Sequence, residues 1–397
     1  MPDLHPARRP RPAVFSLLLA VLLGAALLWL DLAGRPGPLP PARAVALPVA
    51  SGSGPGPAAL LKRSDGGVIP MPEQTPAAHA SNLLAMPPGH AAVVMAFWFA
   101  GTRESAPDVQ IAASQFERST GRWTPARFVI NRHDLGAELG FAVRRLGNPV
   151  AWLDAQGRIH LFVVATGLGG WAAARVVHLR QRGDSVDLAN LSFVALQVLP
   201  LGWWWNTSFL VRNAPLPLAD GGMVLPVHFE LGIKFPVALR FDATGRFLGA
   251  QRMSARRHLL QATLLPLTPS HWVGLLRDQR PEGRVSVVRT LDGGQSWQDA
   301  PDLALVNPDA AVAGLALAPD RLMLAHNSSP HDRSRLDLSQ SADGEHWRLL
   351  HTLAQGAPGE EFSYPALAWA DGSLWVSYTD RRRQIAWQRF VASGPAP

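Results

Sequence analysis

Short apolar runs separated by turn sequences dominate the chain from about Thr75 to Val391. Runs such as AAVVMAFWFAG, RIHLFVVA and SLWVSYT are rich in branched and aromatic residues and are too short for stable helices. The sequences between them combine Asp with Gly, as hairpin turns commonly do, at 154–157, 220–222, 242–245, 292–294, 343–344 and 371–372. The pattern predicts an all-β domain built as a propeller or a sandwich.

Two of these turns share a longer pattern. The segment TLDGGQSW at 290–297 fits S/T-x-D-x-G-x-x-W, and SADGEHW at 341–347 is a version one residue shorter. In such a turn we expect the Asp carboxylate to accept backbone N–H groups, a Gly to take a positive φ and the Trp to pack between strands. These are structural roles. Asp292 and Asp343 lie 51 residues apart, about the length of one four-stranded blade, so a domain over 77–392 would hold about six blades.

The amino end has a different pattern. Residues 13–30 (AVFSLLLAVLLGAALLWL) are 18 uncharged residues, and a helix of that length, at about 1.5 Å per residue, nearly spans a bilayer. Three arginines precede it, and the positive-inside bias would keep residues 1–12 in the cytoplasm. We expect an uncleaved transmembrane anchor in the inner membrane with the domain in the periplasm; the alternative is secretion after signal cleavage. Residues 31–76, rich in Pro, Gly and Ala, predict a linker.

Composition removes several classes of function. The chain has no cysteine, which excludes disulfides, thiol nucleophiles and cysteine-ligated zinc. All but two of the 37 basic residues are arginines, and they are scattered along the sequence, so the net charge of +7 does not indicate a nucleic-acid partner. Motifs for metalloproteases, nucleotide binding and serine hydrolases are absent from the sequence. We expect neither a metal nor another cofactor.

An ordered series of segments then suggests a family. These are HAS at 79–81, FAGTRE at 99–104 with PDV at 107–109, GNPV at 147–150, FSYPAL at 362–367 and YT at 378–379. With the two Asp/Gly/Trp turns, known as Asp-boxes, they make most of residues 77–390 resemble the sialidase (neuraminidase) superfamily, nearest the bacterial sialidase-like proteins with BNR repeats. The resemblance implies a six-bladed β-propeller that releases a terminal acidic sugar from a glycan. The expected partner is therefore a glycan or glycoconjugate.

The resemblance also implies roles for individual residues. In the family, arginines hold the sugar carboxylate because guanidinium offers planar, bidentate donors. An Asp serves as acid/base, and a Tyr polarised by a Glu is the nucleophile. By resemblance Asp108 is the acid/base, Tyr364 is the nucleophile and Arg103 lines the sugar pocket.

The carboxylate-binding arginines are placed in the same way. Arg277 resembles the second arginine of the family's triad, with Arg280 as a competitor, and Arg335 resembles the third, with Arg333 as a competitor. We also expect Arg212 to face the central site. The run WWWN at 203–206 offers aromatic rings for stacking on a sugar and an amide for its hydroxyls, although core packing would explain the same run.

Two positions depart from the family pattern. His79 stands where the first triad arginine belongs, and a His contacts a carboxylate as a cation only while it is protonated. Gln261 stands where the Glu partner of the Tyr belongs, and an amide accepts a hydrogen bond but takes no proton. We keep both in the sugar-binding set and name Glu361 or Glu230 as a replacement for the Glu. The departures leave a second function open, that of a non-catalytic glycan-binding or assembly propeller.

Overall fold

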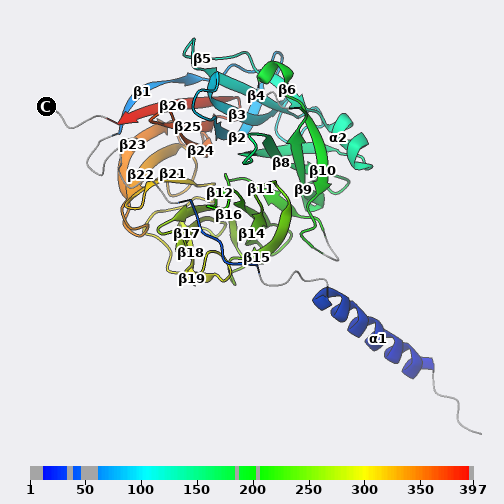
Figure 1. Cartoon of the computed structure of the whole chain (residues 1–397). Helices are drawn as coiled ribbons and strands as arrows, with labels where there is room; N and C mark the ends of the chain where they lie inside the picture. Colours follow the sequence, from blue (N-terminus) through cyan, green and yellow to red (C-terminus); the bar gives the residue numbers. More distant parts are fainter. Residues whose placement is uncertain (1–11, 34–38, 46–60, 184–186, 203–205, 393–397) are drawn as a thin grey trace, which may run out of the picture.

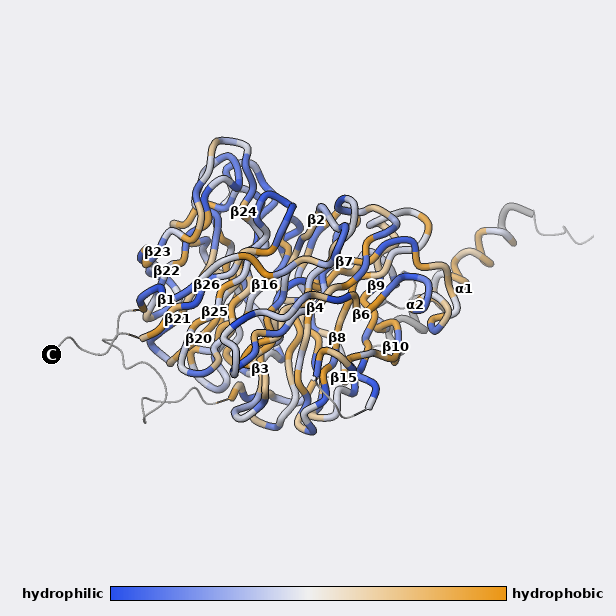
Figure 2. The backbone as a smooth tube through the Cα atoms, turned by 90° about the horizontal axis from the view of Figure 1, so that it is seen from above, coloured by the Kyte–Doolittle hydropathy of each residue, from blue (hydrophilic) through white to orange (hydrophobic). Residues whose placement is uncertain are grey.

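Six antiparallel sheets are arranged around a common centre in this computed structural model, which describes residues 12–33, 39–45, 61–183, 187–202 and 206–392 (Figure 1). The prediction of an all-β, six-bladed propeller is therefore confirmed. Each blade has its first strand at the centre and its last strand at the rim. Figure 2 shows apolar segments within the strands and polar segments in the loops.

The strands of blades 1 to 3 follow one another in sequence. Blade 1 contains β2 (Ala77–Ala85), β3 (Ala92–Gly101), β4 (Gln110–Glu117), β5 (Arg122–Trp123) and β6 (Arg127–Ile130). Blade 2 contains β7 (Arg145–Leu153), β8 (Ile159–Thr166), β9 (Ala174–Gln181) and β10 (Phe193–Val198). Blade 3 contains β11 (Phe209–Val211), β12 (Leu216–Pro217), β13 (Met223–Phe229), β14 (Phe235–Phe241) and β15 (Phe247–Arg252).

Blades 4 to 6 complete the ring. Blade 4 contains β16 (Leu259–Pro266), β17 (Trp272–Asp278), β18 (Ser286–Thr290) and β19 (Gln298–Ala300). Blade 5 contains β20 (Ala313–Ala318), β21 (Arg321–Asn327), β22 (Arg335–Ser341) and β23 (Arg348–Gln355). Blade 6 contains β24 (Phe362–Ala370), β25 (Ser373–Asp380), β26 (Gln384–Ala392) and β1 (Leu61–Val68). The helical elements are α1 (Pro12–Ala33), α2 (Arg132–Leu139), η1 (Gly170–Ala173) and η2 (Leu188–Asn190).

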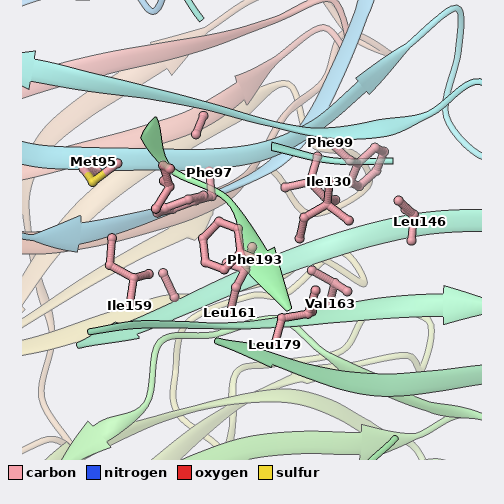
Figure 3. Packing of buried hydrophobic residues seen from close by; sticks show 14 of the residues in the cluster. Met95, Phe97, Phe99, Ile130, Leu146, Ile159, Leu161, Val163, Leu179 and Phe193 are labelled. Atoms are coloured by element: carbon pink, nitrogen blue, oxygen red, sulfur yellow. The ribbon is translucent and has the colours of Figure 1, made fainter. Parts of the chain in front are cut away.

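The inner strands explain why the apolar runs are nearly continuous. Every residue of β3, β8 and β16 is buried, because these strands lie between neighbouring blades. Between blades 1 and 2, Phe97 packs edge-on against Phe193, with ring centroids 6.4 Å apart (Figure 3). Strands buried on both faces show a continuous apolar run, whereas half-buried strands alternate.

The ring is closed by a strand from the amino-terminal side. Strand β1 pairs antiparallel with β26 and forms the outer edge of blade 6. Its sequence, LKRSDGGV, is mostly polar and its side chains are mostly exposed, so it carries no apolar signal. The assignment of all of 31–76 to a linker is therefore wrong for β1, because backbone pairing rather than side-chain burial holds this strand.

A second part of the predicted linker also packs on the propeller. Ala42 and Ala44 are buried in a cluster with Trp272, and the amide of Ala44 donates to the Pro269 carbonyl at 2.7 Å. The side-chain amide of Gln295, in the first Asp-box, donates to the Leu39 carbonyl at 2.7 Å. Residues 39–45, here called the strap, therefore lie across blades 3 and 4. Alanines and backbone groups make these contacts, which leave no periodic pattern in the sequence.

The predicted amino-terminal helix is present as α1, and the side chains described in it, from 15 to 27, are exposed. Within the described residues, no helix combines the length and the apolar character of a membrane span. The helical part of the prediction is confirmed and its membrane-spanning part is not supported. The placement of the domain in the periplasm stays a prediction.

Both Asp-boxes have the local structure expected of them. Asp292 Oδ1 accepts the Ser296 amide at 2.9 Å, and Gly293 and Gly294 have φ of 70° and 86°. Asp343 Oδ1 accepts the amides of the second and third residues after it, both at 2.8 Å. These turns join the third and fourth strands of blades 4 and 5, so they lie at one end of the ring, here called the Asp-box face.

The opposite end carries the candidate site. Because neighbouring strands are antiparallel, the loop between the second and third strands and the connection to the next blade both emerge at this end, here called the mouth. In four blades the inner strand bulges there, and the first residue of each bulge has a positive φ without being glycine. The other two blades have such a residue just before the inner strand. The six residues are Ala80, Asn148, Ser208, Gln261, Asp309 and Tyr364.

Candidate functional site

Arg277 on β17 is the centre of the site. Its Nη1 donates to Gln261 Oε1 at 3.2 Å and to the Tyr364 hydroxyl at 3.5 Å, and its Nε donates to Asp309 Oδ1 at 2.6 Å. Its three partners all occupy left-handed positions, in three different blades. Burial lowers the pKa of Arg277, but Tyr364 and the Asp309 hydrogen bond outweigh that effect and raise it above its ordinary value. Arg277 is therefore a fixed cation at the mouth.

Two further arginines share one carboxylate, that of Glu361. Glu361 Oε1 accepts Arg333 Nη1 at 3.1 Å, and Glu361 Oε2 accepts Arg382 Nε at 2.6 Å. Ser363 also donates to this carboxylate, at 2.5 Å. Burial raises the pKa of Glu361, but the Arg382 and Ser363 hydrogen bonds and the Arg333 charge outweigh it and lower the pKa to about 2. Glu361 is thus ionised and holds two guanidinium groups beside Tyr364.

Arg212 lies beneath the site, with 1% of its surface exposed. Its η nitrogens donate to the carbonyls of Ser81 at 3.3 Å and Pro365 at 2.8 Å, which belong to the bulges of β2 and β24. Its guanidinium carbon is 5.1 Å from the Tyr364 ring centroid. Asn213 holds the β16 bulge in the same way, through the carbonyls of residues 261 and 262. Arg212 therefore supports the site from below and presents no exposed donor to a sugar.

His79 is buried against Tyr364, with ring centroids 4.3 Å apart. Burial is the main reason that its pKa is lowered to about 3, and neither ring nitrogen has a hydrogen-bond partner among the described residues. His79 is therefore neutral at physiological pH. It cannot supply the cation that the family has at this position.

Arg103 and Asp108 lie in the exposed loop between β3 and β4, at the mouth. Asp108 accepts the amide and the hydroxyl of Thr102 at 2.8 and 2.9 Å. Partial burial raises the pKa of Asp108, but these two bonds outweigh it and lower the pKa below its ordinary value. The ion pair that joins this loop to the site is made by Glu104 and Arg382, and not by either predicted residue.

Arg335 does not reach the site. Its Nε donates to both carboxylate oxygens of Asp337, at 3.0 and 3.1 Å, and its Nη2 donates to the Thr352 hydroxyl. Arg333, the competitor, has its guanidinium carbon 5.9 Å from the Tyr364 ring centroid. The prediction that Arg335, and not Arg333, lies at the site is therefore wrong. Arg335 begins β22, where its side chain follows the strand, whereas Arg333 belongs to the loop that enters the mouth.

Neither proposed replacement for the Glu partner reaches the Tyr364 hydroxyl. Glu361 is bound to Arg333, Arg382 and Ser363, and Glu230 lies 3.5 Å from His228. Among the described residues, no carboxylate is within hydrogen-bond distance of that hydroxyl. Gln261, which the resemblance places in the position of that Glu, accepts a hydrogen bond from Arg277 Nη1 at 3.2 Å.

Asp309 and Arg382 were missed. Both lie in connections at the mouth. Arg382 is the middle residue of three consecutive arginines, 381–383, and among 35 arginines in the chain nothing in the sequence distinguishes it. The tryptophans at 203–205 lie outside the described residues, and Asn206 uses its side chain to bind the backbone at Leu199, Leu201 and Gly202.

Comparison with known proteins gives a family and a fold. The model of the BNR repeat-like domain matches residues 93–376. Comparison with curated protein sequences yields no relative.

Among solved structures, a protein of unknown function from Dyadobacter fermentans is 13% identical with a TM-score of 0.63, over 84% of this chain and 99% of its own. Trypanosoma rangeli sialidase in complex with sialic acid is 13% identical with a TM-score of 0.61, over 85% of this chain and 58% of its own. The NanB sialidase from Streptococcus pneumoniae is 11% identical with a TM-score of 0.58, over 84% of this chain and 70% of its own. The chain thus spans just over half of the trypanosomal sialidase, and at these identities the likeness shows the fold alone.

Proposed function

Since the chain belongs to the BNR repeat-like domain family and folds as a sialidase-like propeller, we propose that its central site binds the terminal acidic sugar of a glycan. One observation carries the proposal: two arginines from two blades face one tyrosine at the mouth, and a third, Arg212, lies buried beneath it. Arg277 contacts the Tyr364 hydroxyl at 3.5 Å, and the guanidinium carbons of Arg212 and Arg333 lie 5.1 and 5.9 Å from its ring centroid. Guanidinium groups at a mouth favour a carboxylate ligand.

Arg212 strengthens the preference for an anion. Its guanidinium is buried and bonds only to carbonyls, and its Nε has no partner among the described residues. Burial lowers the pKa of Arg212 to about 10, so it remains a cation at neutral pH. Buried charges are stabilised when an opposite charge approaches. An anionic sugar over Tyr364 would supply that charge.

The chemistry at Tyr364 favours binding without efficient cleavage. A tyrosine nucleophile must give its proton to an acceptor during attack, and a base has to lie within hydrogen-bond reach. The Arg277 cation contacts this hydroxyl through Nη1, and the same nitrogen donates to the Gln261 amide oxygen. Neither group takes a proton. We therefore propose a glycan-recognition protein whose sialidase-like site lacks a general base.

Exo-sialidase-like hydrolysis is the second candidate, and one observation favours it. The loop that bears Asp108 is joined to the Tyr364 blade by the Glu104–Arg382 ion pair. The expected acid/base and the expected nucleophile therefore stand on adjacent blades at the same mouth.

Two assays on one protein separate the candidates. Calorimetry would measure the binding of 3′-sialyllactose, a glucuronic-acid-terminated disaccharide and lactose, and 4-methylumbelliferyl glycosides of the two acids would measure release. We expect at least one acidic sugar to bind about tenfold or more tightly than lactose, without release of fluorophore. The Gln261→Glu variant, which places a carboxylate on the same Arg277 nitrogen that contacts Tyr364, should gain release. Release by the natural protein that Tyr364→Phe abolishes would establish hydrolysis instead, and an absence of both binding and release would refute both candidates.

A matched pair of arginines controls for charge. Arg333 and Arg335 are two residues apart, and only Arg333 contacts the site. Arg333→Gln should weaken binding of the acidic sugar, whereas Arg335→Gln should leave it unchanged. Equal effects of the two substitutions would show that binding follows net charge and not this site.

A further inference from the structure

The inner strand of blade 1, β2, presents no cation to the mouth. The inner strand of that blade presents His79, which is buried, neutral and without a hydrogen-bond partner among the described residues. On the blade 4 and blade 5 sides stand Arg277 and Arg333. Two guanidinium groups therefore face Tyr364 from one half of the ring.

Arg382 approaches the same place from blade 6. It belongs to the turn between β25 and β26, where its φ is 59°. Its Nε is fixed by Glu361 at 2.6 Å, and its Nη1 is fixed by Glu104 from blade 1. The Arg382 carbonyl accepts the amide of Ala78 at 3.2 Å, so Arg382 lies against the start of β2, the strand that carries His79.

The guanidinium of Arg382 retains a free donor. Its side chain is 47% exposed, and in the described part of the chain no group accepts from its Nη2. Because Glu361 binds Arg333 as well, one carboxylate holds the two guanidinium groups in fixed orientation next to each other. A ligand carboxylate then meets donors that are already ordered, which reduces the entropy lost on binding.

We propose that Arg382 supplies the missing cation, so that Arg277, Arg333 and Arg382 together bind the carboxylate of the terminal sugar. This inference rests on the proposed function. It assigns to the β25–β26 turn the role of selecting acidic over neutral sugars. The acid group of the ligand would be held by residues of blades 4 to 6.

The neighbouring arginine provides the control. Arg381 precedes Arg382 in the same turn, has a similar φ of 50° and pairs with Glu360, and its guanidinium stacks on Phe362. The test compares Arg382→Gln, Arg382→Lys and Arg381→Gln with the unaltered chain. Calorimetry measures the binding of 3′-sialyllactose, the glucuronic-acid-terminated disaccharide and lactose at two salt concentrations, and thermal unfolding reports on the fold.

Arg382→Gln should weaken binding of the acidic sugar about tenfold or more, as expected for loss of a charge-assisted contact, and should reduce its salt dependence. Arg382→Lys should restore part of the affinity, and Arg381→Gln should bind as the unaltered chain does. If Arg382→Gln binds the acidic sugar normally, or loses acidic and neutral sugars equally, the inference is overturned. If the unaltered chain binds no acidic sugar, the proposed function itself fails.

Discussion

The mouth and the Asp-box face use the same backbone conformation with different residues. In the Asp-boxes the positive φ values belong to glycines, at positions 293, 294 and 344. At the six positions in or just before the inner strands at the mouth they belong to residues with side chains, including Gln261, Asp309 and Tyr364. A side chain in this conformation costs about 1–2 kcal/mol, whereas glycine adopts it freely. The inner-strand positions at the mouth are therefore strained, whereas the two Asp-boxes avoid this strain by using glycine.

The carboxylates of the two regions differ in the same way. Asp292 and Asp343 bind amides and hydroxyls of their own turns, within four residues. Asp309 and Glu361 bind guanidinium groups at least 21 positions away in the sequence. Hydrogen bonds within a few residues stabilise the Asp-box turns, whereas ion pairs between blades assemble the site at the mouth. Strain that long-range contacts maintain is typical of functional positions.

The largest effect we predict is on binding. Arg277→Gln removes the cation that joins Gln261, Asp309 and Tyr364, so binding of the acidic sugar should fall about a hundredfold. Thermal unfolding should change little, because Asp309 is partly exposed and can be hydrated. Calorimetry and a melting curve on the same sample measure both. If the variant loses binding because it unfolds, the claim that the mouth serves binding and not stability is contradicted.

The next effect is on stability and belongs to the other face. A Cβ at Gly293 would meet the Ala42 carbonyl of the strap at 1.9 Å, and the φ there is 70°. Gly293→Ala should therefore lower the free energy of unfolding by about 1–3 kcal/mol and loosen the strap, with sugar binding unchanged. Denaturant unfolding and limited proteolysis of the amino-terminal segment provide the measurement.

Gly372→Ala is the control for this variant, because its φ of 64° brings strain while its Cβ would meet nothing within 4 Å. It should destabilise the protein less than Gly293→Ala does. Impaired sugar binding in Gly293→Ala would contradict the separation of the two faces.

Features that depend on local contacts could be predicted from the sequence, whereas features that depend on contacts between blades could not. The Asp-boxes are encoded within eight residues, so their structure and the six-bladed fold were predicted correctly. The gathering of Arg277, Gln261 and Tyr364 came from family resemblance alone. The choice of Arg335 over Arg333 failed because a shift of two positions separates a side chain that follows strand β22 from one that lies in the loop before it. Strand β1 and the strap were missed because backbone groups and alanines hold them.

A histidine in each region gives opposite pH dependence. The pKa of His79 is lowered mainly by burial to about 3, whereas an unfolded His titrates near pH 6.5. Below pH 6.5 His79 binds a proton in the unfolded chain but not in the native protein. The free energy of unfolding therefore falls as the pH drops toward 3. His79→Gln should flatten this acid limb by up to about 1.4 kcal/mol per pH unit. Denaturant unfolding from pH 7 to pH 4 measures it, and an unchanged limb would show that His79 is accessible to protons.

The smallest effect concerns His346 in the second Asp-box. Its hydrogen bond to Asp343, at 2.7 Å, raises the pKa of this exposed ring. The pair therefore contributes stability below pH 6.5 that is lost as the pH rises through the raised pKa. His346→Gln should weaken the protein slightly at acid pH and not at alkaline pH, and more so in low salt, where exposed pairs are less screened. The sign of the difference in melting temperature at pH 5 and pH 9 tests it.

A structure of the protein with a bound acidic sugar tests the central claim most directly. Crystals soaked with N-acetylneuraminic acid or glucuronic acid should show a sugar at the mouth over Tyr364, with its carboxylate within hydrogen-bond distance of Arg277 and Arg333. A sugar bound elsewhere, a carboxylate turned away from these arginines, or a mouth that stays empty at saturating concentrations of both acids would contradict the account.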